Sequence, residues 1–120
     1  MIHKHLLTAA ALTTGLALAA PAMAGSTAAT PLVGTDGPGF TITLTKGGKA
    51  VKTLKHGSYA ITVHDKSAAH NFHIFGPGVA KVVTSVPFQG TKKVTVTLKK
   101  GTYKFICDPH PFMKGSFTVR

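Results

Sequence analysis

Apolar and polar residues alternate along most of the chain from Phe40 onwards, with the period of two that is typical of half-buried β-strands. The clearest case is the segment 92–98, in which two valines and a leucine alternate with lysine and threonine. Similar segments cover residues 40–45, 51–54, 59–64, 70–75, 103–107 and 117–119. Turn sequences rich in Gly, Pro and Lys separate them at intervals of about 8–12 residues. The pattern predicts a single all-β domain of about seven to eight short strands, in a β-sandwich or barrel.

The inward faces of these strands predict the hydrophobic core, because residues two apart on a strand point to the same side of the sheet. The predicted core consists of Phe40, Ile42, Leu44, Tyr59, Ile61, Val63, Phe72, Ile74, Val94, Val96, Leu98, Phe105, Phe117 and Val119. No segment repeats apolar residues at helical spacing, and no internal repeat indicates a second domain.

Residues 1–24 differ in composition from the rest and match a secretory signal peptide. A short basic head precedes an apolar run over residues 6–20, and Ala22-Met23-Ala24 forms a small-x-small cleavage site. The run is shorter than the roughly 20 residues of a membrane span, and an uncleaved N-terminal anchor is the alternative. We expect cleavage after Ala24 and a periplasmic or secreted protein without stable membrane insertion.

Residues 25–37 are small, polar and interrupted by Pro and Gly. They predict a flexible N-terminal leader, which could end in an edge strand. The folded domain is then expected to cover residues 38–120, a length that suffices for one modest core.

Basic residues dominate the charge. The chain has a formal charge of +11, which becomes +10 without Lys4, and it contains no Glu. Such a charge favours acidic partners or anionic surfaces. We expect no nucleic-acid binding, because the lysines are scattered over strands and turns of an exported chain. We also expect no enzymatic activity, because three scattered aspartates offer no paired carboxylates and no nucleophile–base set is present.

Cys107 is the only cysteine, so it cannot form a disulfide within the chain. An odd cysteine in an exported protein indicates intermolecular pairing, a reactive thiol or a metal ligand. Its neighbours favour the metal ligand, because His110 and Met113 follow within one seven-residue segment. Thiolate, imidazole and thioether together suit copper. Pro109 and Pro111 flank His110 and stiffen the loop.

Each of these residues also has a purely structural explanation. A lone Cys is usually a small buried hydrophobic residue, and Met113 could fill the core. A metal-free sandwich used for binding or adhesion would follow, but it leaves three ligand types in one short loop unexplained. A type 1 copper site adds a second His to Cys, His and a long axial Met. His70, 37 residues before Cys107, is the natural donor, and His73 is the competing imidazole.

Two segments resemble the cupredoxin family. The segment CDPHPFMKGSFTV (107–119) resembles the ligand loop of cupredoxins, above all the amicyanin type with its short C-x2-H-x2-M spacing. The upstream AHNFHIFGPG (69–78) resembles the segment that supplies the first His ligand, and LKKGTYKFICDPH (98–110) is similar to a strand of plastocyanin-like domains. The resemblance covers roughly residues 38–120 and implies a Greek-key β-sandwich with one type 1 copper near one end.

The resemblance implies that His70, Cys107, His110 and Met113 bind the copper. It also implies that Asn71 hydrogen-bonds the thiolate through its backbone N–H and ties the two loops through its side chain. His73 lies an odd number of residues from His70, so on a regular strand the two point to opposite faces. His70 is therefore the preferred ligand.

The function implied is one-electron transfer, with electrons leaving through the exposed edge of His110 to a redox protein. That partner is expected to be acidic, or to dock on an apolar rim formed by Pro109, Pro111, Phe112 and the 76–79 loop. We expect a monomer. A periplasmic copper-binding or copper-delivery protein without a dedicated redox partner is the alternative, because it would use the same ligands.

Overall fold

The computed structural model describes residues 11, 14–15 and 28–120. The predicted signal peptide over residues 1–24 lies almost entirely outside these residues, and cleavage after Ala24 stays a prediction. The described part consists of strands and connecting loops, and it contains no helix with the length and apolar character of a membrane span. The strands are β1 (Thr30–Asp36), β2 (Ile42–Lys46), β3 (Lys49–Ala50), β4 (Thr53–Leu54), β5 (Gly57–Asp65), β6 (Phe72–Gly76), β7 (Val79–Thr84), β8 (Gly90–Leu98), β9 (Gly101–Cys107) and β10 (His110–Val119).

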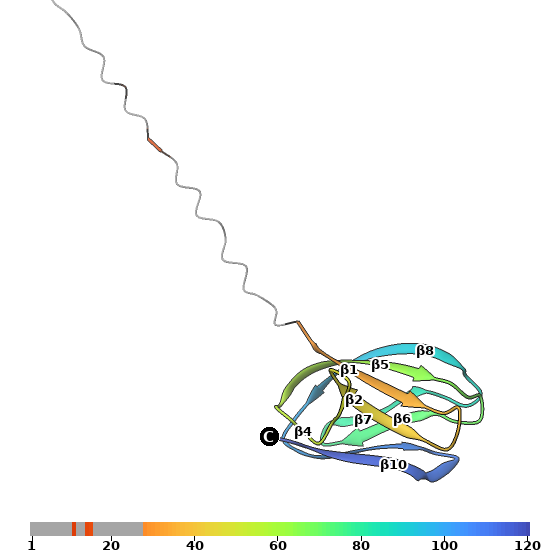
Figure 1. The fold of residues 1–120 in the computed structure, drawn as a ribbon. Coiled ribbons are helices and arrows are strands. Elements are labelled where there is room, and N and C mark those ends of the chain that lie inside the picture. The colour runs from red at the N-terminus through yellow and green to blue at the C-terminus, as the bar shows by residue number, and fades with distance from the viewer. Residues whose placement is uncertain (1–10, 12–13, 16–27) are drawn as a thin grey trace, which may run out of the picture.

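These strands form two five-stranded sheets that face each other as a sandwich (Figure 1). One sheet has the order β3-β2-β1-β5-β8, and the other has the order β4-β10-β9-β6-β7. Most neighbours are antiparallel, whereas β1 pairs with β5 and β10 pairs with β4 in parallel. The prediction of an all-β Greek-key sandwich is confirmed. The described residues hold more strands than predicted, because β1, β3 and β7 lie outside the segments that show alternation.

β1 corrects the prediction of a flexible leader over residues 25–37, which is wrong for residues 30–36. This strand lies inside its sheet, antiparallel to β2 and parallel to β5 along its whole length. Its inward positions are Leu32, Gly34 and Asp36, all of them buried. Only the first is apolar, so the period-two pattern that reveals the other strands is absent here.

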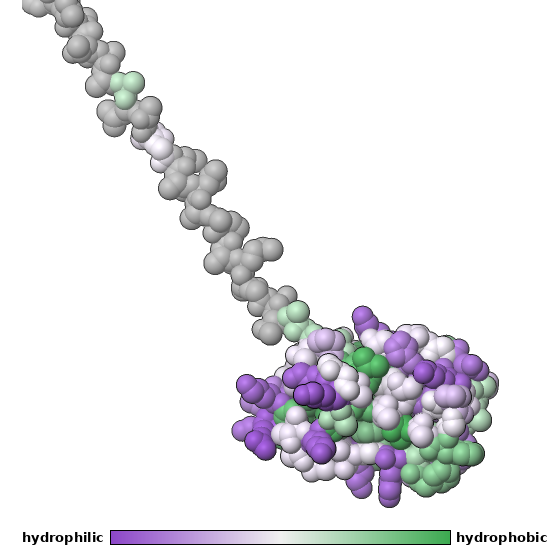
Figure 2. Space-filling view, viewed as in Figure 1, coloured by the Kyte–Doolittle hydropathy of each residue, from purple (hydrophilic) through white to green (hydrophobic). Residues whose placement is uncertain are grey.

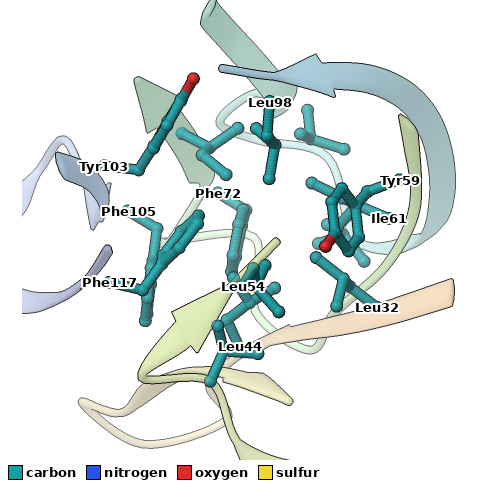
Figure 3. Close-up of a cluster of buried hydrophobic side chains, with 14 of the residues drawn as sticks. Leu32, Leu44, Leu54, Tyr59, Ile61, Phe72, Leu98, Tyr103, Phe105 and Phe117 are labelled. Atoms are coloured by element: carbon teal, nitrogen blue, oxygen red, sulfur yellow. The ribbon is translucent and has the colours of Figure 1, made fainter. Parts of the chain in front are cut away.

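Side chains from both sheets meet in one core (Figure 3). The second sheet contributes stacked aromatic rings, with Phe72 against Phe105 at 5.7 Å and Tyr103 against Phe117 at 5.4 Å between centroids. Gly34 allows the ring of Phe72 to approach β1, since an added Cβ there would lie 2.9 Å from it. Rigid aromatic packing of this kind holds the two sheets at a defined separation.

Most predicted core residues are buried, but Phe40 is not. Its side chain is 64% exposed in the loop between β1 and β2, so its assignment to the core is wrong. Val94 and Val96 lie on the edge strand β8 and are only partly buried, packing against the core from its margin. Core residues that the pattern missed are Leu32, Val51, Leu54, Val83 and Tyr103.

Candidate metal centre

Three of the predicted ligand residues meet at one end of the sandwich. The Sγ atom of Cys107 lies 3.7 Å from Nδ1 of His70 and 3.6 Å from Nδ1 of His110. The two Nδ1 atoms are 3.0 Å apart, and all three donor atoms lie within 4.8 Å of one another. Cys107 and His70 are buried, and His110 is partly exposed. Their role as ligands stays a prediction, but the fold brings the donor atoms together.

Cys107 and His110 come from the β9–β10 hairpin. Alternation along β9 points Tyr103, Phe105 and Cys107 toward the core. Cys107 is the last of these buried residues on the strand. Cys107 pairs directly with His110 across the turn. The register then shifts between His110 and Lys114, an irregularity that breaks the alternation within the predicted ligand loop.

Met113, the predicted axial ligand, lies within this irregular part of β10 and is 2% exposed. Its burial places the thioether among interior side chains at the end of the sheet where Cys107 and His110 lie. Coordination by Met113 stays a prediction.

His70 is oriented by backbone contacts on both sides. Its backbone N–H donates to the carbonyl of Ser67 at 3.1 Å in the loop after β5. Its Nε2 lies 2.9 Å from the carbonyl oxygen of Gly39. Because a carbonyl can only accept, Nε2 carries the proton in this contact, and the neutral ring presents the lone pair of Nδ1 to Cys107. A histidine ligand needs this tautomer to bind a metal through Nδ1.

Asn71 ties the His70 loop to the hairpin, as predicted for its side chain. Its Nδ2 donates to Oδ2 of Asp108 at 2.8 Å, and the backbone N–H of Asp108 donates to its Oδ1 at 2.7 Å. Whether the Asn71 backbone N–H hydrogen-bonds the thiolate stays a prediction. The two side-chain bonds fix the position of His70 relative to Cys107.

His73 lies outside the donor cluster. Its Nδ1 contacts Oδ1 of Asp108 at 3.0 Å, on the outer side of the sheet. Partial burial acts to raise the pKa of Asp108, but hydrogen bonds from His73 and Asn71 together hold it below its usual value. Asp108 therefore stays ionised and anchors both side chains.

Exposed aromatic side chains surround His110. The ring of Phe40 lies 5.1 Å from that of His110 and 5.6 Å from that of His70, while Phe112 lies 5.8 Å from His110. The two Phe rings contact each other at 5.7 Å. Figure 2 shows hydrophobic residues gathered at this end of the sandwich, where the β1–β2 loop and the start of β10 lie. Phe40 was not predicted at this rim, although the preceding Gly37-Pro38-Gly39 indicates that a strand does not continue through it.

The 76–79 loop does not belong to this rim, and that part of the prediction is wrong. The carbonyl of Pro77 accepts a hydrogen bond from the hydroxyl of Tyr103 at 2.7 Å, and the side chain of Lys99 lies beside Gly78. These partners lie at the start of β9, whereas Cys107 ends it, roughly 20 Å away at 3.3 Å per residue. Because β6 runs antiparallel to β9, the 76–79 turn that follows β6 lies at the end of the sandwich away from Cys107.

The donor set fits a single type 1 copper ion. One thiol and two imidazole nitrogens converge in a largely buried space, and a buried thioether lies on the same hairpin. Soft sulfur together with imidazole is the ligand type that selects copper. The prolines, the Asn71–Asp108 contacts and the Gly39 carbonyl restrict the movement of these donors.

Comparison with known proteins gives a consistent result. The family model described as a cupredoxin-like domain matches residues 9–119. Amicyanin-alpha of Methylorubrum extorquens is 38% identical over 68 residues, which cover 55% of this chain and 57% of that protein. The match thus spans little more than half the length of this relative.

Among solved structures, reduced rusticyanin matches with a TM-score of 0.54 and 21% identity, covering 75% of this chain and 78% of the other. A second structure of the copper protein rusticyanin matches with a TM-score of 0.53 and 20% identity over 75% and 76% of the two chains. At this level of identity the likeness concerns the fold.

Proposed function

The chain belongs to the cupredoxin-like family, and on this premise we propose that it is a type 1 copper protein that carries single electrons between redox partners. The observation that carries the proposal is the convergence of Cys107 Sγ with the Nδ1 atoms of His70 and His110. The partial match to amicyanin-alpha supports the same assignment. When bound, copper supplies the one-electron Cu(II)/Cu(I) couple.

The residues of the chain hold the donor atoms in place and exclude water. Cys107 is 0% exposed, so its sulfur is shielded from solvent and from other thiols. His70 is held by Gly39, and the hairpin is held by Asn71. Donors that cannot rearrange favour fast electron transfer, because little reorganisation accompanies a change in charge.

His110 is the proposed exit for electrons. It is the partly exposed member of the cluster, and Phe40 and Phe112 frame it with apolar surface. A partner that docks on these rings would approach the imidazole edge closely. The lysines elsewhere on the surface would speed the encounter with an acidic partner more than they would strengthen the complex.

The proposal includes export and cleavage after residue 24, which would leave a periplasmic or secreted chain. The signal-peptide pattern of residues 1–24 supports it. It includes electron transfer without turnover of a substrate, in a monomer that binds no nucleic acid.

An absorption spectrum of the oxidised, copper-loaded protein tests the proposal. We expect an intense thiolate-to-Cu(II) charge-transfer band in the visible region, and its loss in Cys107→Ala, because the thiolate is its source. Copper-loaded protein without this band would overturn the type 1 assignment. Reversible voltammetry would support electron carriage, whereas rapid transfer of copper to an acceptor protein would indicate delivery instead.

His70→Ala and His73→Ala form a matched pair for the ligand choice. Both remove an imidazole near Asn71, but only His70 lies in the donor cluster. We expect His70→Ala to bleach or strongly shift the band and His73→Ala to preserve it. The opposite result would make His73 the ligand.

A further inference from the structure

Two aspartates lie side by side in the interior near the metal centre. Asp36 ends β1 and Asp65 ends β5, and the two are direct partners in the parallel pair. Side chains of such partners lie on the same face of the sheet. Asp36 is 0% exposed and Asp65 is 2% exposed, so both side chains are shielded from solvent.

Few contacts compensate for this burial. Both side-chain oxygens of Asp36 and Oδ2 of Asp65 have no hydrogen-bond partner. Only Oδ1 of Asp65 has one, the backbone N–H of Ser67 at 3.1 Å. The sole ion pair within residues 28–120 is His73–Asp108, so no lysine or arginine neutralises either group. Two unpaired buried carboxylates would be strongly unfavourable.

We propose that Asp36 and Asp65 form one buried proton-binding site, in which a single proton is shared between the two carboxyl groups. Two carboxylates can only accept hydrogen bonds, and one proton turns one of them into a donor to the other. The shared proton removes one charge and gives a partner to two otherwise unpaired oxygens.

The environment of Asp36 supports this assignment. Burial, followed by the hydrogen bond that a protonated Asp36 would donate to Asp65 and by the charge of Asp65, raises the pKa of Asp36 from 3.8 to about 7. Asp65 accepts the Ser67 N–H, which stabilises negative charge on that side. We therefore expect the shared proton to reside mainly on Asp36.

The other groups facing the pair are uncharged or turned to solvent. The β-sheet neighbours of Asp36 and Asp65 on the flanking strands are Ile42 of β2 and Gly90 of β8. Across the sandwich, β6 presents Phe72 to β1 and β7 ends in the buried Thr84.

His64 and Lys66, which flank Asp65 in the sequence, are exposed, and His64 contacts Thr91. His70 of the loop above already donates from Nε2 to Gly39. Within residues 28–120, no hydrogen bond or ion pair joins either carboxyl group to one of these side chains.

The pair lies where both strands lead into the loops of the metal centre. β1 continues to Gly39 and Phe40, β5 continues to His70, and Lys66 N–H donates to the Asp36 carbonyl at 2.9 Å between them. Loss of the shared proton would add a second negative charge beneath these loops. If the proposed function holds, this charge favours the oxidised, more positive centre, so the reduction potential falls as pH rises.

Carboxyl carbon NMR of the metal-free and Cu(I)-loaded protein tests the proton site directly. Between about pH 5 and pH 9 we expect the signals of Asp36 and Asp65 to move together with one midpoint near neutrality. Asp36→Asn should abolish this titration, and Asp108→Asn should leave it in place. Both carboxyl groups ionised at pH 5, or no joint titration in this range, would overturn the proposal.

Protein-film voltammetry tests the consequence separately. The wild-type potential should fall across the same pH range, and Asp36→Asn or Asp65→Asn should flatten that part of the curve. An equal slope in wild type and both variants would refute the coupling to the centre. Because the metal-free protein is titrated as well, a failure of copper binding and a failure of the proton site give different results.

Discussion

At the metal centre, the positions of the donors depend on neighbouring residues that are not themselves predicted ligands. His70 depends on Gly39, and the hairpin carrying Cys107 depends on the contact between Asn71 and Asp108. Asp108 is touched by Asn71 from the interior and by His73 from the surface. These two contacts involve the same carboxylate but differ in burial, so their contributions can be separated.

Replacing Asn71 with Ala should destabilise the metal-free protein by about 1–3 kcal/mol, because the Asp108 N–H and carboxylate each lose a largely desolvated partner. Urea unfolding measures this loss. His73→Ala is the matched control, and we expect a change of at most about 1 kcal/mol, because His73 is 26% exposed whereas Asn71 is 3% exposed. Equal effects of the two substitutions would show that Asn71 does not tie the loops.

At the level of elements, β1 connects the two halves of its sheet. It lies between β2 and β5, and its C-terminal end delivers the Gly39–Phe40 loop to the metal centre. The hairpin β9–β10 delivers Cys107 and His110 from the other sheet. The donor cluster therefore requires both sheets to pack in one arrangement, which the shared core maintains, including the close approach of Phe72 to Gly34 of β1.

The structural importance of β1 can be tested with Leu32→Ala and Val33→Ala. Leu32 is 1% exposed in the core, so its truncation should cost about 2–5 kcal/mol. Val33 points to the opposite face and is 39% exposed, so its truncation should cost less than about 1 kcal/mol. Thermal or urea unfolding gives both values. Two small effects would indicate that residues 30–36 behave as a leader after all.

For the whole molecule, the distribution of acids matters more than their number. Of the three aspartates, Asp36 and Asp65 are buried and Asp108 alone is exposed. The prediction that the three aspartates are scattered is therefore wrong for Asp36 and Asp65, which lie side by side. The described surface presents lysines with almost no compensating carboxylate, which strengthens the expectation of an acidic partner.

The buried pair also predicts how global stability depends on pH. The folded-state pKa of Asp36, about 7, lies above its unfolded value, so the folded state binds the proton more tightly. Its contribution is fully present below about pH 4 and is lost as the pH rises to about 7. The loss amounts to a few kcal/mol at most, at about 1.4 kcal/mol per pKa unit.

Urea unfolding of wild type and Asp36→Asn at about pH 5 and pH 8 isolates this contribution. The stability of wild type relative to the variant should be lower at pH 8 than at pH 5. Asp108 contributes in the opposite direction, because its lowered pKa gives stability that is lost only as the pH falls through the acidic range. A constant difference between wild type and variant would contradict the raised pKa.

The sequence by itself determined the all-β class and the ligand loop. Regular alternation along β5, β8 and β9 follows directly from burial of one strand face, and Cys107, His110 and Met113 lie within one short segment. These features depend on residues close together in the chain, so the sequence reveals them.

Only the tertiary structure decided the place of β1, the exposure of Phe40 and the meeting of Asp36 with Asp65. The inward positions of β1 hold Gly34 and Asp36, which carry no apolar signal. The partners of these residues lie tens of positions away along the chain, on strands whose pairing depends on the packing of both sheets. Contacts of that kind arise from the closed sandwich, and no local pattern specifies them.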